Sequence, residues 1–109
     1  MANAEKYDDL IIGSGIAGKF AAWTRGSRRT AIVERGLLGG ACPNVACLPS
    51  KNMIWSAKVI SLARRGSEFG LKTEALSVDM AAVQWRKREM VRELRKIHED
   101  HTKHLRSPH

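Results

Sequence analysis

A glycine-rich hexapeptide, GSGIAG at residues 13–18, follows a short apolar stretch and precedes a run rich in alanine. The apolar stretch, YDDLIIG at residues 7–13, has the length and composition of a buried strand. The alanines after the hexapeptide favour a helix, which Gly26 and Ser27 should end. A second apolar and β-branched run, TAIVE at residues 30–34, predicts another strand. The order of strand, helix and strand within about thirty residues predicts an α/β fold with a βαβ unit.

The hexapeptide has the spacing GxGxxG, with Gly13, Gly15 and Gly18. After a strand and before a helix, the first glycine allows a tight turn, the second lets a pyrophosphate approach the backbone, and the third allows close helix packing. The N–H groups that open the helix then face the phosphates. Glu34 ends the second strand about twenty residues later, where an acid accepts hydrogen bonds from an adenosine ribose. Ordinary turns also contain glycine, and a strand-end carboxylate is often only solvated, so both alternatives stay open here.

The two cysteines of the chain, Cys42 and Cys47, lie five residues apart. In one regular helix their Cα atoms would be roughly 8.6 Å apart, whereas a disulfide tolerates at most about 7 Å. A bonded pair therefore requires a break in the helix. Pro43 disfavours helix at Cys42, and Pro49 favours a helix that begins just after Cys47. A helix N-terminus beside Cys47 would stabilise its thiolate, and we expect reagents to reach Cys42 first.

Three uses of the cysteine pair remain open from spacing alone: a redox pair, two buried reduced thiols, or part of a zinc site. The beginning of the chain, MANAEKYDDL, is acidic where a signal peptide is basic, and no apolar run reaches membrane-spanning length. We therefore expect a cytoplasmic protein, in which stable structural disulfides are rare. Zinc would need two further ligands, and we assign neither that role nor a catalytic one to the histidines, which are His98, His101, His104 and His109.

The net charge of the chain is +8, and seven of its 19 Lys and Arg residues lie within residues 85–104. Four acidic residues are interleaved there, as on a solvated helix face. We favour that interpretation over a nucleic-acid patch, and expect neither a nucleic-acid nor a membrane partner. A helix should run from Pro49 to about Arg65. A second should cover residues 79–104, with Asp79 as its cap. Its apolar positions are Met80, Val83, Met90, Leu94 and Ile97.

Two segments, YDDLIIGSGIAGKFAAW and AIVERGLLGGACPNVACLPSK, resemble the amino-terminal FAD-binding segment of the class I pyridine nucleotide-disulfide oxidoreductases. That family includes dihydrolipoamide dehydrogenase, glutathione reductase and mercuric reductase, and the pattern GGxCxNxxCxPSK carries the resemblance. Weaker similarity continues to about residue 97. The resemblance implies an α/β fold in which a partial Rossmann-like FAD-binding βαβ unit precedes a redox-active CxxxxC loop and helices.

The resemblance also implies FAD as the cofactor and Cys42 and Cys47 as the catalytic pair. Cys47 would lie next to the flavin, and Cys42 would be the interchange thiol that meets the substrate. Electrons would pass from NAD(P)H through FAD to the disulfide and on to a disulfide or a metal ion. Mercuric reductase and dihydrolipoamide dehydrogenase are nearly equal as the subtype. The implied cofactor-binding residues are Gly13, Ser14, Gly15, Gly18, Glu34, Arg35, Gly40, Ala41 and Lys51.

Longer chains of the family add nicotinamide, central and dimerisation domains, which we do not find in these 109 residues. We therefore expect the amino-terminal part of an FAD-binding domain, with the βαβ unit at 1–36, the redox loop and helix at 37–66 and the long helix at 79–104. Such a fragment should bind FAD, should be inactive alone, and should meet NAD(P)H only through the absent domains. Full-length relatives are expected to be homodimers. The alternatives are a non-catalytic dinucleotide-binding module and a basic interaction module.

Four features depart from the family pattern. Ala41 stands where Thr is usual, Ala46 stands where Gly is usual, and Asp9 occupies a usually apolar strand position. The crossover between the two strands is also somewhat short. Ala41 lacks the hydroxyl that would form a hydrogen bond, and Ala46 has less backbone freedom than glycine. The short crossover makes the packing of its helix uncertain.

Overall fold

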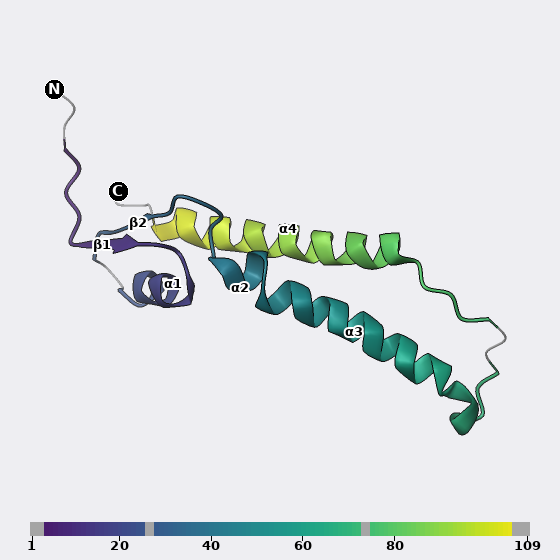
Figure 1. Cartoon of the computed structure of the whole chain (residues 1–109). Helices are drawn as coiled ribbons and strands as arrows, with labels where there is room; N and C mark the ends of the chain where they lie inside the picture. Colours follow the sequence, from purple (N-terminus) through teal and green to yellow (C-terminus); the bar gives the residue numbers. More distant parts are fainter. Residues whose placement is uncertain (1–3, 26–27, 73–74, 106–109) are drawn as a thin grey trace.

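A computed structural model describes residues 4–25, 28–72 and 75–105 of the chain (Figure 1). The molecule is elongated, with extents of 71 × 25 × 21 Å and a Cα radius of gyration of 20.8 Å. A compact domain of this length would have a radius of gyration near 13 Å. Figure 1 shows a small α/β part at one end and two long helices that extend away from it.

The α/β part consists of strand β1 (Asp9–Ile12), helix α1 (Ile16–Trp23) and strand β2 (Thr30–Val33). The strands are parallel neighbours, in a register that pairs Asp9 with Thr30 and Ile12 with Val33. The predicted strand, helix and strand are thus present, although both strands are shorter than the runs 7–13 and 30–34. The predicted helix breakers at 26 and 27 lie outside the described residues.

Close packing of α1 on the strand end depends on Gly18. A Cβ at this position would lie 2.1 Å from the carbonyl oxygen of Gly13 and 3.3 Å from the side chain of Ile11. Ala22, one turn further along, is 1% exposed. Small residues on this face therefore let α1 pack closely on the sheet. The short crossover had made that packing uncertain from the sequence.

The polar residue in the first strand is neutralised locally. Asp9 accepts a hydrogen bond from Arg28 Nε at 2.8 Å, and Arg25 Nε lies 3.8 Å from the same carboxylate. The hydrogen bond from Arg28 lowers the pKa of Asp9 below its ordinary value. Asp9 therefore joins the strand to the end of the crossover instead of disrupting the sheet.

Helices α2 (Ala41–Asn44) and α3 (Cys47–Arg64) hold the two cysteines. Two expectations were wrong here, since Cys42 is helical and α3 begins at Cys47 instead of near Pro49. Each proline is the third residue of its helix, where the N–H has no helical acceptor, so proline costs no hydrogen bond. The required break is nevertheless present, with Ala46 at φ −120° and ψ −97° between the helices.

A short 3-10 helix, η1 (Gly66–Phe69), follows α3, and α4 (Met80–Leu105) then runs back alongside α3 (Figure 1). The predicted cap is present, because the Ala82 N–H donates to Asp79 Oδ1 at 3.0 Å. Arg86 on α4 donates a hydrogen bond to the carbonyl oxygen of Asn52 on α3 at 2.9 Å and so links the two helices.

The apolar positions predicted for the long helix divide into two groups. Val83, Met90 and Leu94 are half-buried, whereas Met80 and Ile97 are each 50% exposed. Val83, Met90 and Leu94 therefore belong to the packing face of α4.

Large apolar side chains stay exposed on the sheet. Leu10 is 63% exposed, Ile12 is 84% exposed and Val33 is 53% exposed. A parallel sheet of this composition is ordinarily covered on both faces, so the α/β part has the character of a partial α/β unit. In the described ranges, no helix is both long and apolar enough to cross a membrane.

Candidate active site

The glycine loop between β1 and α1 leaves open space above its backbone. Gly13 has φ +90°, as a tight turn requires, and a Cβ added at Gly13 or Gly15 would meet nothing within 4 Å. Gly15 is the N-cap of α1, and no side chain caps the helix. The N–H groups of the first helical turn have no partner inside the helix. The loop therefore offers backbone donors and a positive helix end to an anion.

Ser14 connects this loop to the end of the second strand. Its side chain is 1% exposed, and both its N–H and its hydroxyl donate to Glu34 Oε2, at 2.9 and 2.6 Å. The Gly39 N–H donates back to Ser14 Oγ at 3.0 Å. From the sequence we assigned Ser14 only to cofactor binding and did not predict this linking role. A hydroxyl in the glycine loop and an acid after the next strand are the signals that could have indicated it.

Glu34 is held as a carboxylate. Its other oxygen, Oε1, accepts the Gly36 N–H at 2.8 Å. The Ser14 hydroxyl, followed by the amides of Ser14 and Gly36, lowers the pKa of Glu34 to about 2. The backbone amide of Arg35 lowers the pKa of Glu34 in the same direction. Glu34 borders a cavity of about 410 Å³ whose other lining residues are Ile32, Gly36, Leu38, Glu99, Thr102 and Lys103.

The segment before the cysteines lies directly on the glycine loop. Gly40 has φ +72°, and a Cβ there would lie 2.8 Å from Gly15 Cα. Gly39 has φ +97°, and its Cβ would lie 2.8 Å from Pro43 Cγ. Asn44 closes the turn by donating through Nδ2 to the carbonyl of Gly40 at 2.8 Å. Glycine is therefore required at position 40 by contact with the glycine loop, and at position 39 by contact with Pro43.

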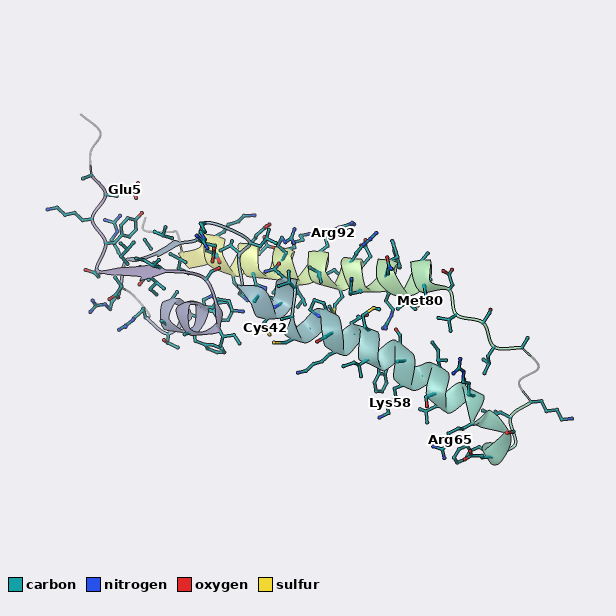
Figure 2. All side chains as sticks on the ribbon, in the orientation of Figure 1. Glu5, Cys42, Lys58, Arg65, Met80 and Arg92 are labelled. Carbon is teal, nitrogen blue, oxygen red and sulfur yellow. The ribbon has the colours of Figure 1, made fainter. Side chains whose placement is uncertain are left out.

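The two thiols are free and interact with each other. Cys42 is half-buried and Cys47 is exposed, which is the reverse of the expected order of access. Hydrogen bonding to Cys47 raises the pKa of Cys42, as do burial and the charge of Cys47, while the charges of Lys19 and Lys51 oppose the shift. Figure 2 shows Cys42 at the junction of α2 and α3. Cys47 and Lys51 are exposed residues one helical turn apart, so an open surface lies beside the pair.

A lysine–histidine contact joins α1 to α4. Lys19 Nζ lies 2.7 Å from His98 Nε2, and His98 Nδ1 lies 2.6 Å from the carbonyl oxygen of Leu94. Nδ1 donates to that carbonyl and Nε2 accepts from the lysine ammonium in this arrangement. Trp23 stacks on the same ring, with centroids 6.3 Å apart. From the sequence we assigned no role to His98, because no local signal relates two residues that lie 79 positions apart in the chain.

Other predicted site residues have less defined surroundings. Ala41 begins α2 and is exposed, and Arg35 is exposed while its backbone amide contributes to the lowered pKa of Glu34. Ala46 has a negative φ, so the position does not need glycine. Among the described residues, no group of three or more His, Cys, Asp and Glu side chains could hold a metal ion. The zinc alternative therefore gains no support there.

The chain was compared with curated proteins and with solved structures. It is 37% identical over 98 residues to a mercuric reductase of Lysinibacillus sphaericus and 39% identical over 93 residues to a dihydrolipoyl dehydrogenase of Bacillus subtilis, matches that cover 87% and 84% of the chain. A flavoprotein disulfide reductase, RclA from Escherichia coli, solved as a Cu(II) complex, superposes with a TM-score of 0.66 at 28% identity over 87% of the chain. The chain belongs to the class I pyridine nucleotide-disulfide oxidoreductase family.

The family match is partial in length. The chain spans 18% of the mercuric reductase, 20% of the dihydrolipoyl dehydrogenase and 19% of the reductase of known structure. No family model matches the chain. The similarity to the two curated enzymes is nearly equal, so it supports the enzyme family without selecting a subtype.

Proposed function

We propose that this chain is the FAD-binding and dithiol-bearing segment of an FAD-dependent disulfide oxidoreductase. The observation that carries the proposal is the contact between Gly40 and Gly15, which brings the cysteine segment onto the glycine loop. A cofactor whose phosphates lie on that loop would have the dithiol within the same site. Membership in a family that contains flavoprotein disulfide reductases supports the choice of cofactor.

The residues of the glycine loop fit a dinucleotide pyrophosphate. Gly13 and Gly15 leave the space that phosphates need, Ser14 fixes the loop through Glu34, and Gly18 brings the helix N-terminus close. Glu34 is ionised and borders an open cavity, so its carboxylate would accept hydrogen bonds from the adenosine ribose. Its fixed carboxylate therefore suits recognition of a sugar that donates through hydroxyl groups.

The exposed start of α3 fits the flavin end of the cofactor. Cys47 and Lys51 share this open surface, and the ammonium of Lys51 would favour the reduced flavin. We assign Gly40 and Ala41 to the same end, and Arg35 to the adenosine end. When bound, FAD supplies the two-electron chemistry between NAD(P)H and the Cys42–Cys47 disulfide.

The dithiol would act by thiol–disulfide exchange. Cys42 gives up its proton and attacks one sulfur of the substrate disulfide, forming a mixed disulfide and releasing the first substrate thiol. Cys47, as thiolate, then attacks the Cys42 sulfur, which closes the intramolecular disulfide and releases the second thiol. The hydrogen bond to Cys47 raises the pKa of Cys42, and the positive charges of Lys19 and Lys51 oppose that rise. A soft metal ion bound by the two thiolates is the other substrate class, and the nicotinamide site and dimer interface would come from other parts of the longer family proteins.

The test uses the FAD-loaded chain and two matched variants, Cys47→Ser and Cys42→Ser. We expect mild oxidation of the wild type to form one intramolecular disulfide, detected by alkylation and mass mapping. FAD affinity should be similar in all three proteins. Under reducing conditions, long-wavelength absorbance from a thiolate beside the flavin should persist in Cys42→Ser and disappear in Cys47→Ser. Two free thiols after oxidation, or equal absorbance in both variants, would contradict the proposal.

A further inference from the structure

A second cavity lies between α4 and the junction of α2 with α3, and its volume is about 450 Å³. This is within the size range of small-molecule sites. Figure 2 labels Arg92, one of the cavity's lining residues on α4. The lining residues are Asn44, Val45, Pro49, Lys87, Arg88, Val91, Arg92 and Arg95. None of them belongs to the glycine loop or the Glu34 environment, and none is a residue assigned above to FAD.

Four of the lining side chains are cationic and none is acidic. Arg92 NH1 contacts Glu89 Oε1 at 2.8 Å, which neutralises one charge. Arg95 Nε donates to Asn44 Oδ1 at 3.4 Å, and this neutral partner positions the guanidinium without cancelling its charge. Four positive charges and one carboxylate leave a formal charge of +3 at the cavity. Like charges on successive helical turns repel each other, so an anion bound there would relieve the repulsion.

The opposite wall of the cavity adds two features. Pro49 belongs to the first turn of α3, whose N-terminus has no side-chain cap, so the positive end of that helix dipole is nearby. Val45, Pro49 and Val91 supply apolar surface. A ligand that combines several negative charges with an apolar part would use both walls.

We propose that this cavity binds a ligand containing a diphosphate group. Arginine forks match phosphate oxygens in bidentate geometry and stay charged at all physiological pH values. Two adjacent phosphates carry about the charge that balances the cavity, and the apolar wall accommodates a nucleoside base. Asn44 and Val45 lie between the two cysteines in the sequence, so the ligand contacts the segment that links the thiols. The source of the diphosphate is either a nucleotide or inorganic pyrophosphate.

Calorimetric titration of the 109-residue chain with ADP and with inorganic pyrophosphate tests the site. The pocket variant is Arg88→Gln with Arg92→Gln, and Lys87→Gln is a second, single-charge variant. The control, Lys58→Gln with Lys96→Gln, removes the same net charge outside the cavity. All titrations are repeated in a Gly15→Ala background, which reduces any binding of ADP to the glycine loop. Helical circular dichroism checks that each variant is folded.

We expect the pocket variant to weaken ADP binding at least about tenfold, because charge-assisted hydrogen bonds are lost. Lys87→Gln should have a smaller effect in the same direction, and the control should change affinity less than about twofold, since exposed charges are screened. Tighter binding of ADP than of pyrophosphate identifies a nucleotide as the ligand, and equal binding identifies the free diphosphate. The inference is overturned if the pocket and control variants weaken binding equally, or if Gly15→Ala alone abolishes it. If the wild-type chain binds ADP but does not bind FAD, only the proposed FAD function is refuted.

Discussion

Replacing Gly18 by alanine should destabilise the chain, although alanine is the better helix former. Helix propensity alone would stabilise the variant by about 0.8–1 kcal/mol. The new Cβ would, however, lie 2.1 Å from the Gly13 carbonyl oxygen. That backbone segment is held by the Gly13 N–H, which donates to the Val33 carbonyl at 2.8 Å. Overpacking costs about 1–3 kcal/mol, and a 2.1 Å approach to a fixed backbone atom belongs at the upper end of that range. We therefore expect a net loss of about 2 kcal/mol.

Gly15→Ala is the matched control, because its Cβ would meet nothing within 4 Å and its φ is −61°. The loss of a glycine N-cap, below about 1 kcal/mol, is offset by the reduced entropy of the unfolded chain, about 0.4–1 kcal/mol. Urea unfolding followed by circular dichroism should therefore show a lower midpoint for Gly18→Ala and almost no change for Gly15→Ala. A Gly18→Ala chain as stable as the wild type would refute the packing argument.

Three further predictions concern single contacts. Cys47→Ser should accelerate alkylation of Cys42 at mildly alkaline pH, because the group that raises the pKa of Cys42 is removed; an unchanged rate would contradict this. The pKa of Glu34 is lowered to about 2 from 4.5, so its stabilising contribution is present above pH 4.5 and is lost as the pH falls toward 2. The difference in unfolding midpoint between wild type and Glu34→Gln should shrink over that interval, and a constant difference would disprove the linkage. Asp79→Ala should lower the free energy of unfolding by about 0.5–2 kcal/mol, whereas Ser77→Ala should not, as thermal unfolding can show.

Local sequence signals predicted the features that depend on neighbouring residues. The spacing of Gly13, Gly15 and Gly18 predicted the turn and the close helix, and Asp79 predicted the start of α4, because each acts within a few residues. The position of the α3 start was wrong because proline was treated as a boundary at Leu48. A helix also tolerates proline within its first turn, where N–H groups are unpaired.

Contacts between distant segments could not be predicted in the same way. The Lys19–His98 contact and the cationic cavity depend on α4 returning alongside α3 and reaching α1. Periodicity identifies the apolar face of α4, but it gives no information on which element that face meets. The Ser14–Glu34 pair is an intermediate case, since both residues were assigned to one ligand while their direct hydrogen bond was not anticipated.

Equilibrium binding of FAD against riboflavin, measured by flavin fluorescence, tests the proposed site most directly. Riboflavin lacks the pyrophosphate and the adenosine, so it cannot use the glycine loop or Glu34. We predict that FAD binds at least about tenfold more tightly than riboflavin, and that Gly15→Ala removes most of this difference while the chain stays folded. Equal affinity for FAD and riboflavin, or unchanged FAD affinity in Gly15→Ala, would contradict binding of the cofactor at this loop.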